Sequence, residues 1–130
     1  MDKNEIFKLL DSIPVDKNEY TILSTCALVV RGIWKTVNDL DLAVTKKGLE
    51  EFKKYYDVKP KDEKWYIIND KIECCVDSMD GKRELIDGYY VQEINDYYKY
   101  LITNKREKDI SKIKIVEEYM KGDLNGRKEL

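Results

Sequence analysis

Asp39 and Asp41, two aspartates separated by one residue, are the strongest candidates for chemistry in this sequence. They open the segment 39–44, in which polar and apolar residues alternate as in a β-strand. Residues i and i+2 of a strand point to one face, with Cα atoms roughly 6–7 Å apart. Carboxylates placed this way repel each other unless a cation neutralises them. Mg²⁺ or Mn²⁺ would do so, whereas the alternative is two solvated carboxylates at a strand end.

Ser24 and Thr25 lie upstream, between a short apolar run at residues 20–23 and an apolar segment at residues 26–33. The run predicts a strand, and the segment predicts a buried helix that ends near Gly32. Serine and threonine are common N-cap residues. The free N–H groups and the dipole at a helix N-terminus also attract phosphate. We expect Ser24 and Thr25 either to cap this helix only or also to donate hydrogen bonds to a polyphosphate.

Taken in order, these segments resemble the nucleotidyltransferase superfamily, typified by DNA polymerase beta and by small stand-alone bacterial members. The resemblance covers residues 22–33, then Thr36, then Asn38 and Asp39-Leu40-Asp41-Leu42. The family usually has a Gly-Gly or Gly-Ser pair, a helix ending in Arg-Gly or His-Gly, a threonine, and Asp-x-Asp on a strand. This chain departs from the pattern at Ser24-Thr25. Glycine there lets the backbone approach phosphate without an intervening Cβ.

The resemblance implies a third carboxylate from a neighbouring strand, which acts as a base on the acceptor hydroxyl or as a further metal ligand. Glu73 and Asp77 are the candidates, because both would leave the same face of a strand at residues 71–77. We prefer Glu73, which lies inside an apolar run where an unpaired carboxylate is costly. The alternative for Glu73 is an exposed residue of a hairpin.

A second resemblance lies downstream, at Lys99 and in the segment 105–110, which includes Arg106. These residues look like the Lys and Arg-x-Lys-Asp segments of stand-alone bacterial nucleotidyltransferases. The resemblance implies that Lys99 and Arg106 bind the nucleotide phosphates or the acceptor. A solvated helix face explains the same charges equally well.

As a whole, the resemblance implies transfer of a nucleoside monophosphate from an NTP to an acceptor hydroxyl, with release of pyrophosphate. Asp39, Asp41 and Glu73 would be catalytic, and the first two would hold Mg²⁺ or Mn²⁺ against the triphosphate. The acceptor would be an antibiotic, an RNA end or a protein, and the small size fits a toxin-like or antibiotic-modifying protein. The alternative is a catalytically degenerate nucleotide-binding or protein-interaction module, which the departure at Ser24-Thr25 favours.

The elements that would position these residues alternate between helix and strand. A helix precedes the strand–helix–strand unit that contains the two aspartates. A helix capped by Thr45, a hairpin at residues 65–76, a short strand and two helices follow. This order predicts an α/β or α+β domain with a small mixed sheet flanked by helices, and with further helices at its C-terminal end. We expect the domain at residues 1–122 and, beyond a last helix, a polar tail at residues 123–130.

The composition fits one folded domain, because the 130 residues are 42% hydrophobic and 38% charged. The net charge of −2 argues against non-specific capture of nucleic acid. The chain has no histidine, which excludes Ser-His, Cys-His and His-metal chemistry. The sequence shows no signal-peptide pattern, no membrane-spanning run and no zinc-ligand spacing of Cys26, Cys74 and Cys75. We therefore expect a cytoplasmic protein with reduced cysteines and no membrane partner.

Overall fold

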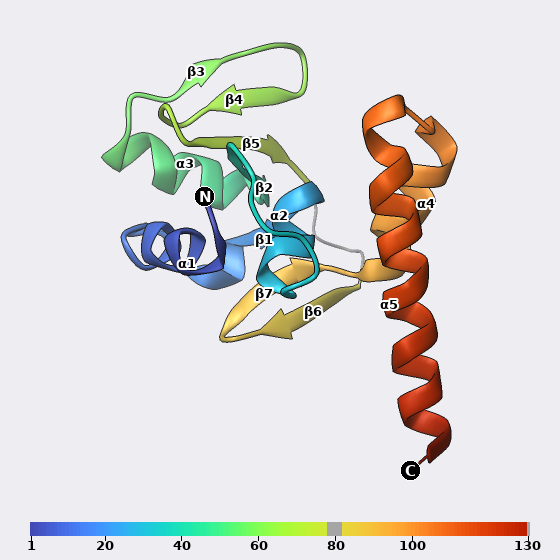
Figure 1. Ribbon diagram of the computed structural model, residues 1–130. Helices are drawn as coiled ribbons and strands as arrows, with labels where there is room; N and C mark the ends of the chain where they lie inside the picture. The colour runs from blue at the N-terminus through green and yellow to red at the C-terminus, as the bar shows by residue number, and fades with distance from the viewer. Residues whose placement is uncertain (78–81, 130) are drawn as a thin grey trace. The chain divides into compact units, whose positions relative to one another are not determined.

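The computed structural model describes residues 1–77 and 82–129, with side chains up to residue 122. The chain divides into two compact units, Met1–Gln92 and Glu93–Leu130, and each is described by itself. The described residues form a mixed α/β structure with a seven-stranded sheet and five α-helices, as the sequence predicts (Figure 1). The sheet and three of the helices belong to the first unit.

The helices of the first unit are α1 (Lys3–Asp11), α2 (Ser24–Val30) and α3 (Lys46–Tyr55). Its strands are β1 (Tyr20–Ile22), β2 (Leu40–Val44), β3 (Lys59–Pro60), β4 (Trp65–Ile67), β5 (Ile72–Val76), β6 (Arg83–Ile86) and β7 (Tyr89–Gln92). They form one sheet in the order β3-β4-β5-β2-β1-β7-β6. β2 runs parallel to β5 and β1 runs parallel to β7, whereas the other neighbouring strands are antiparallel.

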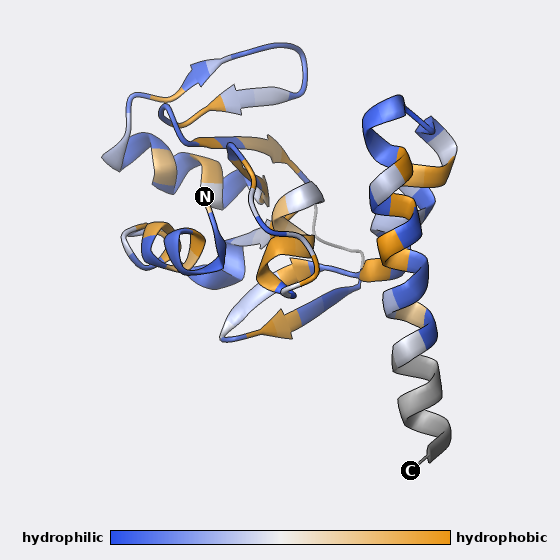
Figure 2. Cartoon of the chain, viewed as in Figure 1, coloured by the Kyte–Doolittle hydropathy of each residue, from blue (hydrophilic) through white to orange (hydrophobic). Residues whose placement is uncertain are grey.

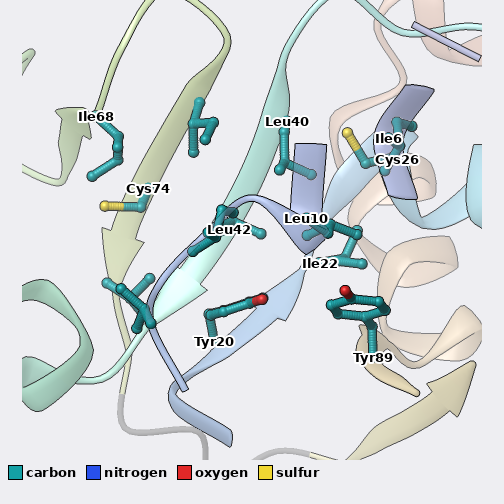
Figure 3. Packing of buried hydrophobic residues seen from close by; sticks show 14 of the residues in the cluster. Ile6, Leu10, Tyr20, Ile22, Cys26, Leu40, Leu42, Ile68, Cys74 and Tyr89 are labelled. Atoms are coloured by element: carbon teal, nitrogen blue, oxygen red, sulfur yellow. The ribbon is translucent and has the colours of Figure 1, made fainter. Parts of the chain in front are cut away.

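The hydrophobic core lies on one face of this sheet. Alternate residues of β1, β2 and β5 contribute to it, including Ile22, Leu40, Leu42 and Cys74, and α1 adds Ile6 and Leu10 (Figure 3). Buried residues of α2 and α3 belong to the same cluster. Figure 2 shows that α2 is mostly hydrophobic, in agreement with the burial of residues 26–30. The intervening strand residues therefore point to the other face, which we call the second face.

The two helices that flank β2 begin in different ways. Thr45 caps α3 as predicted, because its side chain accepts a hydrogen bond from the Gly48 N–H at 2.9 Å. The prediction that Ser24 and Thr25 cap α2 is wrong, since the N-cap residue is Leu23 and no side chain caps this helix. A capping residue needs an extended backbone, whereas Ser24 has a φ of 61°.

The hairpin expected at residues 65–76 is confirmed, because β4 pairs with β5 in antiparallel register. Asn69 orders the turn through its side-chain oxygen, which accepts hydrogen bonds from the N–H groups of Lys71 and Ile72 at 2.9 Å each. The sequence pattern predicts neither β3 nor β6. Both are edge strands of the sheet.

The second unit contains α4 (Ile94–Asn104), a 3₁₀ turn (Glu107–Asp109) and α5 (Ile110–Glu129). Leu101 of α4 and Val116 of α5 are fully buried. The expectation that the last helix ends near Gly122 is wrong, because α5 continues to Glu129. A glycine inside a helix costs only about 1 kcal/mol relative to alanine, so it weakens a helix without ending it.

Two further expectations concern the thiols and the membrane. Cys26, Cys74 and Cys75 are all free, as predicted, and the first two are buried. Among the helices of the described residues, none combines the length and the apolar character needed to cross a membrane.

Candidate functional site

Asp41 and Glu73 lie side by side on two parallel strands. Each is the second residue of its strand, and the two are direct partners in the register between β2 and β5. Paired residues on neighbouring strands lie about 4.8 Å apart. Their neighbours Leu42 and Cys74 are buried in the core, so both carboxylates leave the second face. The fold therefore brings together two of the three carboxylates that the sequence predicts as catalytic.

Asp39 borders this pair from just outside the strand. The prediction that Asp39 belongs to the strand is wrong, because β2 begins at Leu40. The Leu40 N–H donates to the Lys71 carbonyl at 2.8 Å. The thiol of Cys26 donates to the Asp39 carbonyl at 3.0 Å and thereby ties the exposed bend to α2. Asp39 nevertheless acts on Asp41, since its charge raises the pKa of that carboxyl.

The electrostatics of the site centre on Asp41, whose pKa is raised to about 6. Desolvation of this half-buried group is the largest cause, and repulsion by Glu73 and then by Asp39 adds to it. Lys61 lowers the same pKa. Ionisation of Asp41 therefore has an electrostatic cost in this site, which a divalent cation beside it would relieve. Carboxylate oxygens are the kind of donor that Mg²⁺ and Mn²⁺ prefer.

Lys61 is a site residue that sequence reasoning misses. It follows β3, and its Nζ lies 3.0 Å from each carboxylate oxygen of Glu73. This hydrogen bond is the main reason why the pKa of Lys61 is raised. The turn after Lys61 is ordered by Asp62, whose carboxylate accepts hydrogen bonds from the N–H groups of Lys64 and Trp65 at 2.8 Å. Only the pairing of β3 with β4 and of β4 with β5 places this lysine, and no local pattern signals it.

The turn between β1 and α2 is held by Gln92, a second residue that the sequence does not point to. The Ser24 N–H donates to Gln92 Oε1 at 3.0 Å. The backbone of Ser24 is left-handed. The sequence resemblance implies a glycine at this position, and glycine adopts this conformation more readily than serine does. Thr25 is half-buried in the first turn of α2. Because α2 has only seven residues, its dipole offers a phosphate less than a long helix would.

Arg31, which the sequence resemblance places at the end of the helix after Ser24-Thr25, has a structural role here. Its side chain is 1% exposed and lies 3.1 Å from the Glu84 carboxylate. It donates to the Ala27 carbonyl at 2.9 Å and to the Gln92 carbonyl at 2.7 Å. Arg31 therefore ties the end of α2 to β6 and β7, and it holds the residue that contacts the Ser24 turn.

Asp77, the other candidate for the third carboxylate, lies farther along the chain from β5. It is exposed, and its N–H donates to the Val44 carbonyl at 2.8 Å. Asp77 lies four positions beyond Glu73, which corresponds to about 13 Å along an extended chain. The register thus places Glu73, and not Asp77, beside Asp41.

Lys99 and Arg106 belong to the second unit. Lys99 is exposed on α4. Arg106 is engaged within its own unit, because its guanidinium bonds to both oxygens of the buried Asp109, at 2.7 and 3.1 Å. This contact is the main reason why the pKa of Asp109 is lowered. Arg106 therefore has a structural partner already, whereas Lys99 presents its charge to solvent.

Comparison of the chain with protein-family models, with curated proteins and with solved structures gave no match. Within the described residues, no group of three or more acidic, cysteine or histidine side chains is arranged to hold a metal ion. The case for a site therefore depends on its own geometry. Asp41 and Glu73 form its centre, Asp39 borders it, and Lys61 is bound to one of its carboxylates.

This arrangement can do two things chemically. Ionised carboxylates on one face can ligate a divalent cation, and a cation held there would neutralise a phosphate group approaching the sheet. A carboxylate next to that cation can accept a proton from a hydroxyl nucleophile. Glu73 can take part in either step only if it is released from Lys61.

Proposed function

We propose that this chain is a metal-dependent nucleotidyltransferase, which moves a nucleoside monophosphate from an NTP to an acceptor hydroxyl and releases pyrophosphate. Asp39 and Asp41 would hold Mg²⁺ or Mn²⁺, which polarises the triphosphate. Glu73 would take the proton of the acceptor hydroxyl or add a ligand. Phosphoryl transfer needs little covalent chemistry from a protein, so positioned charge supplies most of the catalysis. The acceptor would be an antibiotic, an RNA end or a protein.

The observation that supports this proposal best is the register that pairs Asp41 with Glu73. Residues distant in the sequence meet on one face of the sheet, and on the opposite face the flanking residues Leu40, Leu42, Ile72 and Cys74 are fully buried. The pKa of Asp41 is raised by desolvation first and then by the charges of Glu73 and Asp39, so a divalent cation beside Asp41 would relieve an electrostatic cost. The strand, helix and strand that lead to Asp41 also follow the order that the sequence resemblance implies.

A second candidate function has its own support. The chain would be a degenerate nucleotide-binding or protein-interaction module without turnover. Ser24 places a Cβ and a left-handed serine backbone where a glycine would let phosphate approach. Lys61 occupies the carboxylate that would act as the base.

Calorimetric titration of the four NTPs, with and without Mg²⁺, tests the proposal. We expect Mg²⁺-dependent binding of at least one NTP. Asp39→Asn combined with Asp41→Asn should abolish this binding and leave the circular dichroism spectrum unchanged, because an amide is a poorer ligand for Mg²⁺ than a carboxylate. Asp77→Asn is the matched control, and it should bind the nucleotide like the parent.

A transfer assay then separates the two candidates. The chain is incubated with α-labelled NTP, Mg²⁺ and either bulk tRNA, small hydroxyl compounds or protein acceptors. Labelled product that the double variant fails to form supports the transferase, whereas metal-dependent binding without product supports the degenerate module. Equal MgNTP binding by the parent and the double variant would show that the aspartates are not the metal site.

A further inference from the structure

Lys61 holds the oxygen atoms that a metal at this site would need. Its ammonium lies 3.0 Å from both Oε1 and Oε2 of Glu73, so neither oxygen is left without a cation. The two side chains are 48% and 22% exposed, respectively. The pair is therefore in contact with water, and the ammonium can leave Glu73 without opening the core.

The backbone beneath this lysine is well ordered. The Lys61 N–H donates to the Trp65 carbonyl at 2.8 Å, and the side chain of Asp62 orders the same turn. β3 and β4 thus hold the start of the lysine side chain in place while its four-carbon stem can swing. The ion pair depends on the pairing of β3 with β4 and of β4 with β5, because this order lets the Lys61 side chain reach across β4 to Glu73 on β5.

A divalent cation and the ammonium compete for the same atoms. A metal would bind a Glu73 oxygen at about 2.1 Å, with the ammonium still on that oxygen unless it moves. The two positive charges would then repel each other over a short distance at a half-buried site. The influence of Lys61 also reaches the neighbouring strand, because its charge acts on Asp41 as well as on Glu73.

We propose that Lys61 is a built-in counter-cation, which neutralises Glu73 in the metal-free chain and has to leave before a divalent metal binds Glu73 together with Asp41. This inference rests on the proposed function and specifies how its site is regulated. One consequence is weak metal binding in the absence of nucleotide. A triphosphate offers the displaced ammonium an anionic partner, so metal and nucleotide should bind cooperatively.

Titration of the full chain with Mn²⁺ alone tests the inference, with electron paramagnetic resonance of the unbound ion as the readout. Lys61→Met keeps the apolar stem and removes the charge. We expect its Mn²⁺ dissociation constant to fall about five- to tenfold relative to the parent. Lys64→Met removes a charge from the same turn without removing the contact to Glu73. It should change the constant by about twofold at most, because exposed charges are screened.

A double-variant cycle identifies the contact that is responsible. In a Glu73→Gln chain the ammonium has lost its charged partner, so adding Lys61→Met should lower the dissociation constant by a smaller factor than it does in the parent. Equal Mn²⁺ affinity of the parent and Lys61→Met, with binding observed in both, would overturn the counter-cation role and leave the proposed function standing. Absence of Mn²⁺ binding in every variant would overturn the proposed function and this inference with it.

Discussion

At the scale of single residues, Asp41 shows how the fold stores electrostatic free energy at one position. Its backbone belongs to a strand that the buried Leu40 and Leu42 hold in the core, so its Cα atom stays beside that of Glu73. Its pKa rises to about 6 from an ordinary value of 3.8. The folded chain therefore binds this proton more tightly than the unfolded chain does, and stability depends on pH.

The sign of this dependence leads to the first prediction. The metal-free chain should be most stable with respect to Asp41 below pH 3.8, lose stability as the pH rises to about 6, and change little above that. Asp41→Asn should remove this loss of stability, because asparagine does not ionise. The full shift corresponds to about 3 kcal/mol, and screening by water at a half-buried group reduces this to about 1 kcal/mol. Urea denaturation in the presence of EDTA should thus find the variant more stable by about 1 kcal/mol at pH 7.5.

The gain should nearly vanish at pH 4, where the wild-type carboxyl is protonated. Asp70→Asn is the control, since Asp70 is an exposed aspartate in the turn between β4 and β5, away from Asp41. It should have the same small effect at both pH values. If Asp41→Asn is less stable than the parent at pH 7.5, the charge of Asp41 does not destabilise the metal-free chain.

At the scale of elements, the sequence predicts those helices and strands that show a regular spacing of apolar residues. The alternation in residues 40–44 and the helical spacing of α1 correspond to real elements, because both place apolar side chains into one core. The edge strands β3 and β6 carry no such pattern, since they are held mainly by backbone pairing on one side. The contact of Lys61 with Glu73 depends on strand order, which is set by distant parts of the chain.

The second prediction concerns the turn before α2, where Ser24 stands in place of the glycine that the sequence resemblance implies. Ser24→Gly should stabilise the chain by about 0.5–1 kcal/mol, because glycine adopts a φ of 61° without the steric cost that serine has. Thermal denaturation followed by circular dichroism measures the change. The same variant removes the Cβ from the expected phosphate approach, so an active transferase should bind MgNTP more tightly.

Ser12→Gly provides the matched control for this turn. Ser12 has a φ of −83°, and its hydroxyl donates to the Leu9 carbonyl at 2.6 Å, so glycine there should destabilise the chain. If Ser24→Gly lowers stability as much as Ser12→Gly does, the left-handed serine is not a strained position. If it stabilises the chain without changing nucleotide affinity, the turn does not contact phosphate.

At the scale of the whole molecule, the chain has two compact units, and the proposed site residues are divided between them. The carboxylates, Lys61 and the Ser24 turn belong to Met1–Gln92, whereas Lys99 and Arg106 belong to Glu93–Leu130. The sequence alone predicts both groups of residues, because they lie in segments that follow one another in the order that the sequence resemblance implies. It does not show that Arg106 is committed to Asp109, since the burial of that aspartate follows from how α5 packs on α4.

The division into units leads to the third prediction, which concerns Lys99. If the second unit binds nucleotide, Lys99→Ala should weaken MgNTP binding about tenfold, as expected for loss of a charge-assisted contact to phosphate, and leave Mn²⁺ binding without nucleotide unchanged. Lys114→Ala is the control, because Lys114 is an exposed lysine of the same unit. Calorimetry of the full chain measures both constants. Equal losses in the two variants would indicate a general field effect, and no loss in either would confine the nucleotide site to the first unit.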